Sequence, residues 1–412
     1  MVAQLTVNQF VVGSNPATGA INYHKIAVCM KINNEKDFID IIRKDLNPLS
    51  KEDFFKTKQL GELWDKLESN DIRKRLLKNK EDFYEWCYNF IHSDIPLKLY
   101  FNKRLSYVDF KPADIIPITD NTIDHKSNNV RYIRNINLQD IMNCEGADGK
   151  SIKNIYKDAL EFGKIDRCMT MPSVFKDSYN ENYDTFVVTI KTISGQMSIF
   201  SPTVYNSLLI ETDKYAESKK QKLLIPSASW ASPILATRNS ENYTELHIVD
   251  VQQEVLKTTE ELFKHIHMGG LFNETPYDLK TFCVPSENMT EVIDKDYDKV
   301  FFCPPYYDLE LYGGSDLQST TLYKTYEEWL DLYWRKTVNE CDTVLNAGGL
   351  FCFVMGKNCR GYEMGNDMKT IAEEKFTLKQ EIKIMPPVES TRDSNNNMTE
   401  KYEICYIMKK RV

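Results

Sequence analysis

Short apolar runs alternate with helical stretches through the C-terminal half of this chain, from about residue 185 onward. The runs have the length of buried strands, and each parallel strand needs a long crossover before the next one begins. The expected strands are Phe186–Ile193, Leu223–Ile225, Leu246–Val249, Lys280–Val284, Val300–Phe302, Gly349–Met355 and Tyr402–Met408. The expected helices are Pro202–Ile210, Gln252–His265 and Tyr326–Leu345. This alternation predicts an α/β fold whose mostly parallel sheet is covered by helices on both faces.

The first 150 residues follow a different pattern, which predicts a separate α+β module. Residues 1–33 alternate in strand fashion around a glycine-flanked turn, as in a hairpin. Residues 36–95 then follow a helical period, and Ser50 has the character of a helix cap. We therefore expect a module at 1–150, a connector at 151–184 and a second domain at 185–412.

The charge balance limits the partners of the whole chain. Its 412 residues carry a formal net charge of −8, whereas proteins that bind nucleic-acid backbones generally need a basic face. The composition argues against such a face overall and leaves a local basic groove open. Abundant Lys, Asn, Asp and Ile residues fit an AT-rich genome, as many viruses have.

The ten cysteines are scattered and include no Cys-x-x-Cys pair, so they predict a reducing compartment rather than a disulfide framework. The six histidines form no zinc pattern, and we expect no metal site. No stretch approaches the roughly 18 apolar residues of a membrane span, and the N-terminus lacks the features of a signal peptide. These observations predict a soluble, intracellular protein, in the host cytoplasm or the virion if it is viral.

The tripeptide Pro304-Pro305-Tyr306 directly follows the expected strand Val300–Phe302. Two prolines fix the backbone and remove two donors, so the chain must leave the strand as a stiff turn. An aromatic ring then stands at the C-terminal end of a strand, where open α/β sheets bind ligands. A flat ring in that position suits a planar base taken out of its stack. The alternatives are an ordinary strand-exit turn and a proline-rich ligand motif, although such motifs favour polar, disordered surroundings.

This turn resembles the catalytic motif (Asp/Asn/Ser)-Pro-Pro-(Tyr/Phe/Trp) of the DNA amino-methyltransferases, and Pro304–Tyr312 resembles phage and viral versions of it. These enzymes transfer a methyl group from S-adenosylmethionine to adenine N6 or cytosine N4. The resemblance implies a Rossmann-like class I methyltransferase sheet at 185–412 whose last strand is antiparallel. It also implies that the catalytic positions are Cys303, Pro304, Pro305 and Tyr306.

Three further segments align with the cofactor motifs of the same family, in the family's order: Phe200–Pro202, Leu223–Ala231 and Ile248–Asp250. The resemblance implies that S-adenosylmethionine would lie against Phe200, Pro226, Ala228, Trp230 and Asp250, with Glu287 as a weaker candidate near the adenine ring. An acid in the position of Asp250 can bind both ribose hydroxyls. The alternative role for Asp250 is to cap the helix that follows it.

Four substitutions depart from the family pattern. Ile225 replaces an acid at the end of the first strand, while Ser229 and Ala231 replace two glycines. The glycines allow backbone angles that a Cβ disfavours, so we expect Ser229 and Ala231 to fill part of the cofactor volume. Cys303 replaces the catalytic hydrogen-bond acceptor, and a thiol accepts only weakly.

These coincident substitutions favour a degenerate, catalytically inactive relative that acts as a binding or structural subunit with a protein partner, in a viral particle or another complex. The alternative is an active DNA amino-methyltransferase that uses S-adenosylmethionine and binds DNA. Under both interpretations we expect Asp250 and Cys303 at the C-terminal ends of neighbouring or near-neighbouring strands, facing one crevice.

Overall fold

The computed structural model describes residues 33–68, 79–107, 115–124, 129–146, 151–165, 199–267, 276–294, 296–313, 315–356, 361–385, 390–392, 398–400 and 402–411. The predicted hairpin, apart from its last residue, and the predicted strand Phe186–Ile193 lie outside these ranges. Within them, no helix is long and apolar enough to cross a membrane, and no group of His, Cys, Asp or Glu side chains could hold a metal ion.

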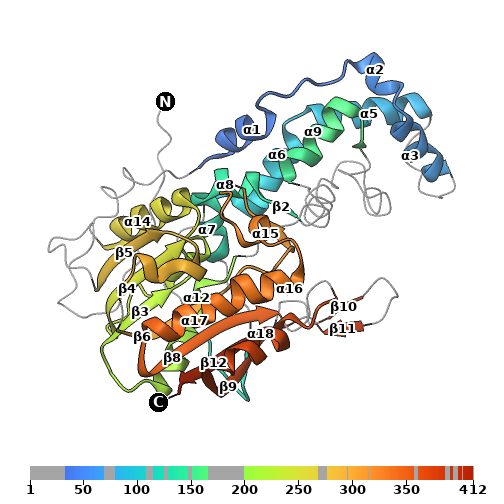
Figure 1. Cartoon of the computed structure of the whole chain (residues 1–412). Coiled ribbons are helices and arrows are strands. Elements are labelled where there is room, and N and C mark those ends of the chain that lie inside the picture. Colours follow the sequence, from blue (N-terminus) through green and yellow to red (C-terminus); the bar gives the residue numbers. More distant parts are fainter. Residues whose placement is uncertain are drawn as a thin grey trace.

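Eight strands of the described residues form one sheet, in the order β1-β9-β12-β8-β6-β3-β4-β5 (Figure 1). Their bounds are β1 Thr122–Asp124, β3 Gln221–Ile225, β4 Tyr243–Asp250, β5 Asp278–Cys283, β6 Tyr297–Phe302, β8 Leu345–Gly356, β9 Phe376–Met385 and β12 Glu403–Lys410. The neighbours from β8 to β5 are parallel, whereas β12 is antiparallel to both β8 and β9. This strand order, with its reversed last strand, is that of a class I methyltransferase, and the predicted Rossmann-like fold is confirmed.

Six of the seven predicted strands lie in this sheet, and the seventh is not described. They were predictable because central strands bury both faces: β8 is buried continuously from Gly348 to Met355. Strand β9 was not predicted, since its Lys379, Glu381 and Lys383 interrupt any apolar run. Strand β1 is only three residues long and pairs with β9 at the edge of the sheet.

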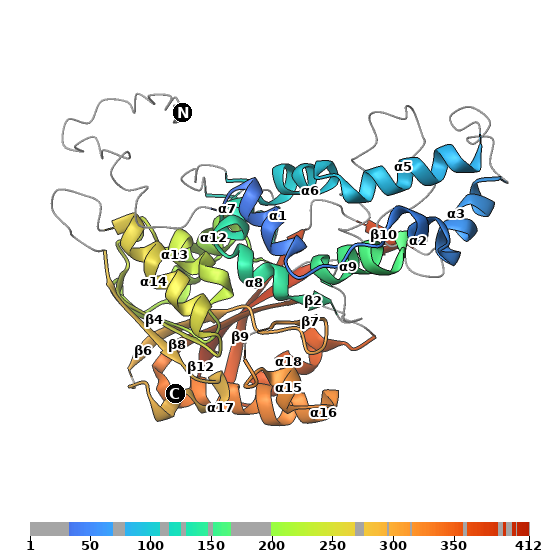
Figure 2. The same cartoon turned by 90° about the horizontal axis from the view of Figure 1, so that it is seen from above.

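Helices cover both faces of the sheet, as the alternation of elements predicts. Figure 2 shows α12 (Pro202–Thr212), α13 (Ser232–Ala236) and α14 (Gln253–His267) on one side. The other side carries α15 (Ser319–Leu322), a continuous helix made of α16 (Tyr326–Glu328), η7 (Trp329–Arg335) and α17 (Lys336–Val344), and α18 (Met364–Ala372). The core therefore lies in two layers, one on each face.

The N-terminal residues form a helical arm that extends to the upper right of the sheet domain (Figure 1). Its helices are α1 (Glu35–Arg43), α2 (Lys51–Phe55), α3 (Lys58–Glu68), α5 (Lys80–His92), α6 (Ile95–Tyr100), η2 (Phe101–Leu105), α7 (Asn129–Ile136), α8 (Leu138–Asn143) and α9 (Ile152–Phe162). Ser50 caps α2 as predicted, accepting a hydrogen bond from the Asp53 amide. Helix α9 falls in the predicted connector, but it packs on α1 and α5 and so extends the module.

Several contacts join the arm to the sheet domain, including the following three. Strand β1 belongs to the main sheet. Strand β2 (Glu145–Gly146) pairs with β7 (Glu310–Leu311), which lies shortly after the Pro304–Tyr306 turn. Asn137 Nδ2 donates to the carbonyl oxygen of Trp230 at 3.2 Å. Two of these contacts, the β2–β7 pairing and the hydrogen bond to Trp230, involve loops that the sequence analysis assigns to the candidate site.

A buried ion pair lies inside the sheet domain. The Lys299 side chain on β6 is fully buried, and its Nζ is 2.5 Å from Asp213 Oδ1. Asp213 is 23% exposed and also accepts hydrogen bonds from Gln221 and Asn242. The two partners are therefore unequal, because only the lysine depends on the pair to compensate its burial.

This asymmetry predicts unequal costs of mutation. Asp213→Ala should lower the free energy of unfolding by about 3 kcal/mol or more, since it leaves a buried ammonium without its carboxylate. Lys299→Met should cost clearly less, because Asp213 keeps two hydrogen bonds and some contact with water. Urea denaturation of both variants measures the difference. Equal losses for the two variants would contradict this account of the pair.

Candidate functional site

A cavity of about 420 Å³ lies at the C-terminal ends of β3, β4 and β6. Nine of the ten candidate residues line it: Phe200, Pro226, Trp230, Asp250, Glu287, Cys303, Pro304, Pro305 and Tyr306. The tenth, Ala228, is fully buried beneath them. Since β4 and β6 both flank β3, Asp250 and Cys303 face one crevice from near-neighbouring strands, as predicted. The functional roles of these residues stay predictions.

The turn after β3 has an unusual backbone. Ser229, Trp230 and Ala231 have φ angles of 45°, 58° and 67°, which is the left-handed region that glycine favours. Each such residue with a Cβ costs about 1–2 kcal/mol. The chain therefore keeps the glycine-type conformation without the glycines. We call Ser229–Ala231 the left-handed turn.

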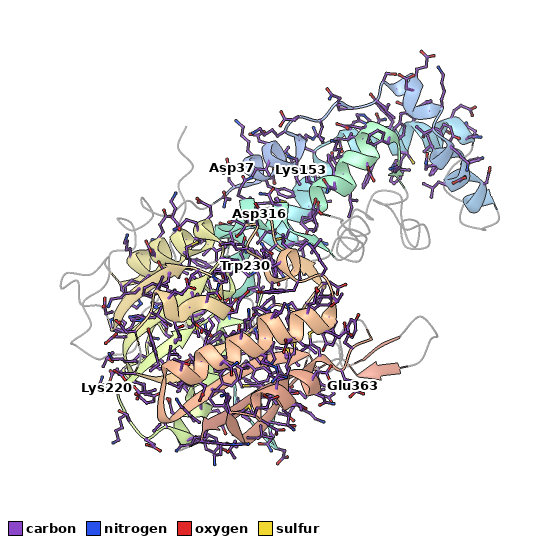
Figure 3. The ribbon with its side chains drawn as sticks, viewed as in Figure 1. Asp37, Lys153, Lys220, Trp230, Asp316 and Glu363 are labelled. Atoms are coloured by element: carbon purple, nitrogen blue, oxygen red, sulfur yellow. The ribbon has the colours of Figure 1, made fainter. Side chains whose placement is uncertain are left out.

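Several hydrogen bonds hold the left-handed turn and its neighbour Ala228 in place. Asp250 Oδ2 accepts from the Ala228 amide at 2.9 Å, and the Ala231 amide donates to the Ala228 carbonyl at 2.9 Å. Another bond comes from Asn137 in the arm, to the Trp230 carbonyl. In Figure 3, Trp230 lies where the arm meets the sheet domain. Strained backbone persists only where its surroundings determine it, and such strain clusters at ligand sites.

The structure corrects the expectation about Ala231 in this loop. Ser229 lines the cavity, but Ala231 is fully buried and is not part of the lining, so its Cβ takes no cavity volume. Ile225 is also fully buried and absent from the lining. The Ile225 side chain, which stands where the family has an acid, therefore packs in the core and does not occupy the cavity.

Asp250 serves the protein backbone with both carboxylate oxygens. Oδ2 binds the Ala228 amide, while Oδ1 accepts from the Gln252 amide at 2.9 Å, just before α14. Burial raises the pKa of this carboxyl. The two oxygens offer about four acceptor sites, and the Val251 amide also acts on the carboxylate, so at least one site can still accept a hydroxyl from the cavity. The capping role and the ribose-binding role are thus compatible in one side chain.

Glu287 lies beyond Asp250, in the short helix η6 (Ser286–Glu291) that follows β5. Its side chain is buried and accepts a hydrogen bond from the Tyr323 hydroxyl at 3.1 Å. Burial raises its pKa. Val255 and Val284 also line the cavity. Two apolar side chains beside a polar acceptor are suited to a flat heterocycle with an amino group.

The Cys303 thiol is in an environment that keeps it protonated. Burial raises its pKa well above the ordinary value, and Glu403 nearby adds to the shift. A neutral thiol is a weak hydrogen-bond acceptor and a poor nucleophile. Cys303 therefore supplies little of what an Asp, Asn or Ser would supply in the same position.

Tyr306 stands at the cavity wall with its hydroxyl already bonded. The hydroxyl donates to Glu403 Oε1 at 2.5 Å, and Glu403 is the first residue of β12. The Leu309 amide donates to the Tyr306 carbonyl at 2.8 Å, and Tyr307 has a positive φ of 35°. The turn after β6 is thus rigid on both sides of the ring.

Several lining residues were not predicted: Arg104, Val130, Arg134, Tyr312, Gln318, Ser319, Thr320 and Tyr333. Three of them come from the arm, whose sequence indicated no function. The four-residue spacing of Val130 and Arg134 places them on one helix face, which was the available signal. Nothing in the sequence indicated that this face would meet the left-handed turn.

No protein-family model and no curated protein sequence matches this chain. Among solved structures, TrmN from Thermus thermophilus is similar at 11% identity and a TM-score of 0.33, over 51% of this chain and 48% of TrmN. The N-methyltransferase NodS from Bradyrhizobium japonicum WM9 is similar at 10% identity and a TM-score of 0.33, over 51% and 96%. A methyltransferase from Pyrococcus furiosus is similar at 14% identity and a TM-score of 0.31, over 50% and 83%.

The chain thus spans about half the length of TrmN. At these TM-scores the assignment of the fold depends on the strand order and on the antiparallel β12, not on the similarity to any of these structures.

The strained turn leads to a prediction about stability. Ser229→Gly should raise the free energy of unfolding by on the order of 0.5 kcal/mol, because the relief of left-handed strain exceeds the entropic cost of glycine. The matched control is Ser227→Gly, two residues earlier and without a positive φ. It should be destabilising by about 0.5–1 kcal/mol. Urea denaturation compares them, and equal destabilisation by both variants would show that the turn is unstrained.

Proposed function

We propose that this chain binds S-adenosylmethionine in the cavity and transfers its methyl group to the exocyclic amino group of a nucleobase, adenine N6 or cytosine N4 in DNA. The observation that carries the proposal is the left-handed turn beside the cavity. Three strained residues without glycine are costly, and a turn without a ligand would gain nothing from them. The fold itself is that of a class I methyltransferase.

The residues present fit the cofactor. The two Asp250 oxygens offer about four acceptor sites, and three backbone amides act on them, so at least one site can accept a ribose hydroxyl. Val255, Val284 and Glu287 would enclose the adenine ring, and Phe200 with the left-handed turn would lie along the methionine part. When bound, S-adenosylmethionine supplies an activated methyl group on a sulfonium.

The acceptor base would lie on the other side, near Tyr306. The ring of Tyr306 stands on a rigid turn and can stack on a planar base, and Tyr312 adds a second ring to the wall. The carbonyl oxygen of Pro304 can accept a hydrogen bond from the target amine, which helps to orient its lone pair. Cys303 contributes only a weak acceptor, so we expect slow transfer.

A second candidate is the degenerate role, in which the protein is a binding subunit with a protein partner. Two observations favour it: Cys303 is a neutral thiol, and the Tyr306 hydroxyl is already committed to Glu403. The net charge of −8 also disfavours general DNA binding. This candidate keeps the fold and dispenses with methyl transfer.

Substitution at Cys303 distinguishes the two candidates. Cys303→Ser restores an acceptor with little change of volume and should raise the methyl-transfer rate about fivefold, the worth of one neutral hydrogen bond. The control, Cys303→Ala, removes the weak acceptor and should bring no gain. The measurement is incorporation of labelled methyl groups into unmodified duplex and single-stranded DNA. No incorporation by the wild type and by Cys303→Ser would contradict the enzyme and favour the binding subunit.

A further inference from the structure

Helix α7 of the arm forms part of the cavity wall. Val130 and Arg134, one turn apart, both line the cavity. Asn137, three residues further, donates to the Trp230 carbonyl in the left-handed turn. One face of the helix therefore lies against the turn. Arg104 from η2 lines the cavity as well, close enough for its charge to act on Arg134.

The acids of the cavity wall already have partners. Asp250 accepts from two backbone amides, Glu287 accepts from Tyr323, and Glu403 accepts from Tyr306. In the part of the chain that the structure describes, no carboxylate lies within ion-pair distance of the Arg134 guanidinium. Arg134 is half-buried, and burial together with Arg104 lowers its pKa to about 10. It is charged at neutral pH, so a half-buried cation lines the cavity with no anion beside it among the described residues.

We propose that Arg134, with Arg104 beside it, binds the carboxylate of the methionine part of the cofactor. This inference rests on the proposed function and gives the N-terminal arm a direct part in it. A planar guanidinium binds a carboxylate through two parallel hydrogen bonds, which makes arginine the suitable residue for this role.

The place of Arg134 favours the methionine end of the cofactor. Asp250 at the end of β4 would bind the ribose, and Glu287 is in η6, after the neighbouring strand β5. Arg134 is on α7, whose Asn137 contacts the left-handed turn, and Phe200, which the family resemblance assigns to the cofactor, lines the same cavity. Ile225 leaves no acid for the amino group of the methionine part. The carboxylate is then the remaining charged group by which the protein can hold that end.

The test compares two ligands that differ by one carboxylate. Calorimetry on the full chain measures the affinity for S-adenosylhomocysteine and for its decarboxylated analogue, which keeps the amine. Arg134→Gln should weaken S-adenosylhomocysteine binding about 10- to 100-fold, the range for a lost charged hydrogen bond, and should leave the affinity for the analogue unchanged. Arg134→Lys should give an intermediate affinity for S-adenosylhomocysteine, because lysine keeps the positive charge but cannot form the two parallel hydrogen bonds of a guanidinium.

The matched control is Arg131→Gln on the same helix. Arg131 bonds to the Asn102 carbonyl and to Ser106 and does not line the cavity, so both affinities should stay the same. Equal weakening of both ligands by Arg134→Gln would indicate a structural role and overturn the proposal. The proposal would also be overturned if Arg134→Gln left both affinities unchanged and weakened the binding of a DNA oligonucleotide. That result would indicate that Arg134 binds a phosphate. Wild-type protein that binds neither nucleoside would remove the proposed function as well.

Discussion

The hydrogen bonds that hold the left-handed turn are the interaction on which the candidate site depends. Asp250 binds the Ala228 amide from within the sheet domain, and Asn137 binds the Trp230 carbonyl from the arm. Without them, Ser229, Trp230 and Ala231 would relax toward ordinary backbone angles, because each carries a Cβ that the left-handed region disfavours. The turn would then move relative to the strand end, and the wall of the cavity would change with it.

This arrangement couples the two parts of the chain. In a Rossmann-like sheet the ligand lies at the C-terminal ends of the strands, where only loops can reach it. Here Asn137 of the arm donates a hydrogen bond to the left-handed turn, and Arg104 and Arg134 of the arm line the cavity. Strand β2 also pairs with β7, shortly after the Pro304–Tyr306 turn. The arm therefore contacts both the left-handed turn and the segment after the Pro304–Tyr306 turn, and it adds two arginines to the cavity wall of an acidic protein.

The sheet domain could be predicted from the sequence because its central strands are buried on both faces and read as apolar runs. The place of Asp250 and Cys303 followed from the strand ends and from the resemblance to DNA amino-methyltransferases. The conformation of Ser229–Ala231 could not be predicted, since local preference argues against three left-handed residues with side chains and only long-range contacts impose them. The place of Arg134 in the cavity wall could not be predicted for the same reason. It depends on tertiary packing between segments about 100 residues apart.

A crystal structure of the full chain with S-adenosylhomocysteine at millimolar concentration tests the central claim most directly. We expect positive φ angles at Ser229, Trp230 and Ala231, with the ribose hydroxyls in hydrogen-bond reach of Asp250. The central claim is contradicted by a structure in which the cavity holds no nucleoside and the turn has relaxed to negative φ angles.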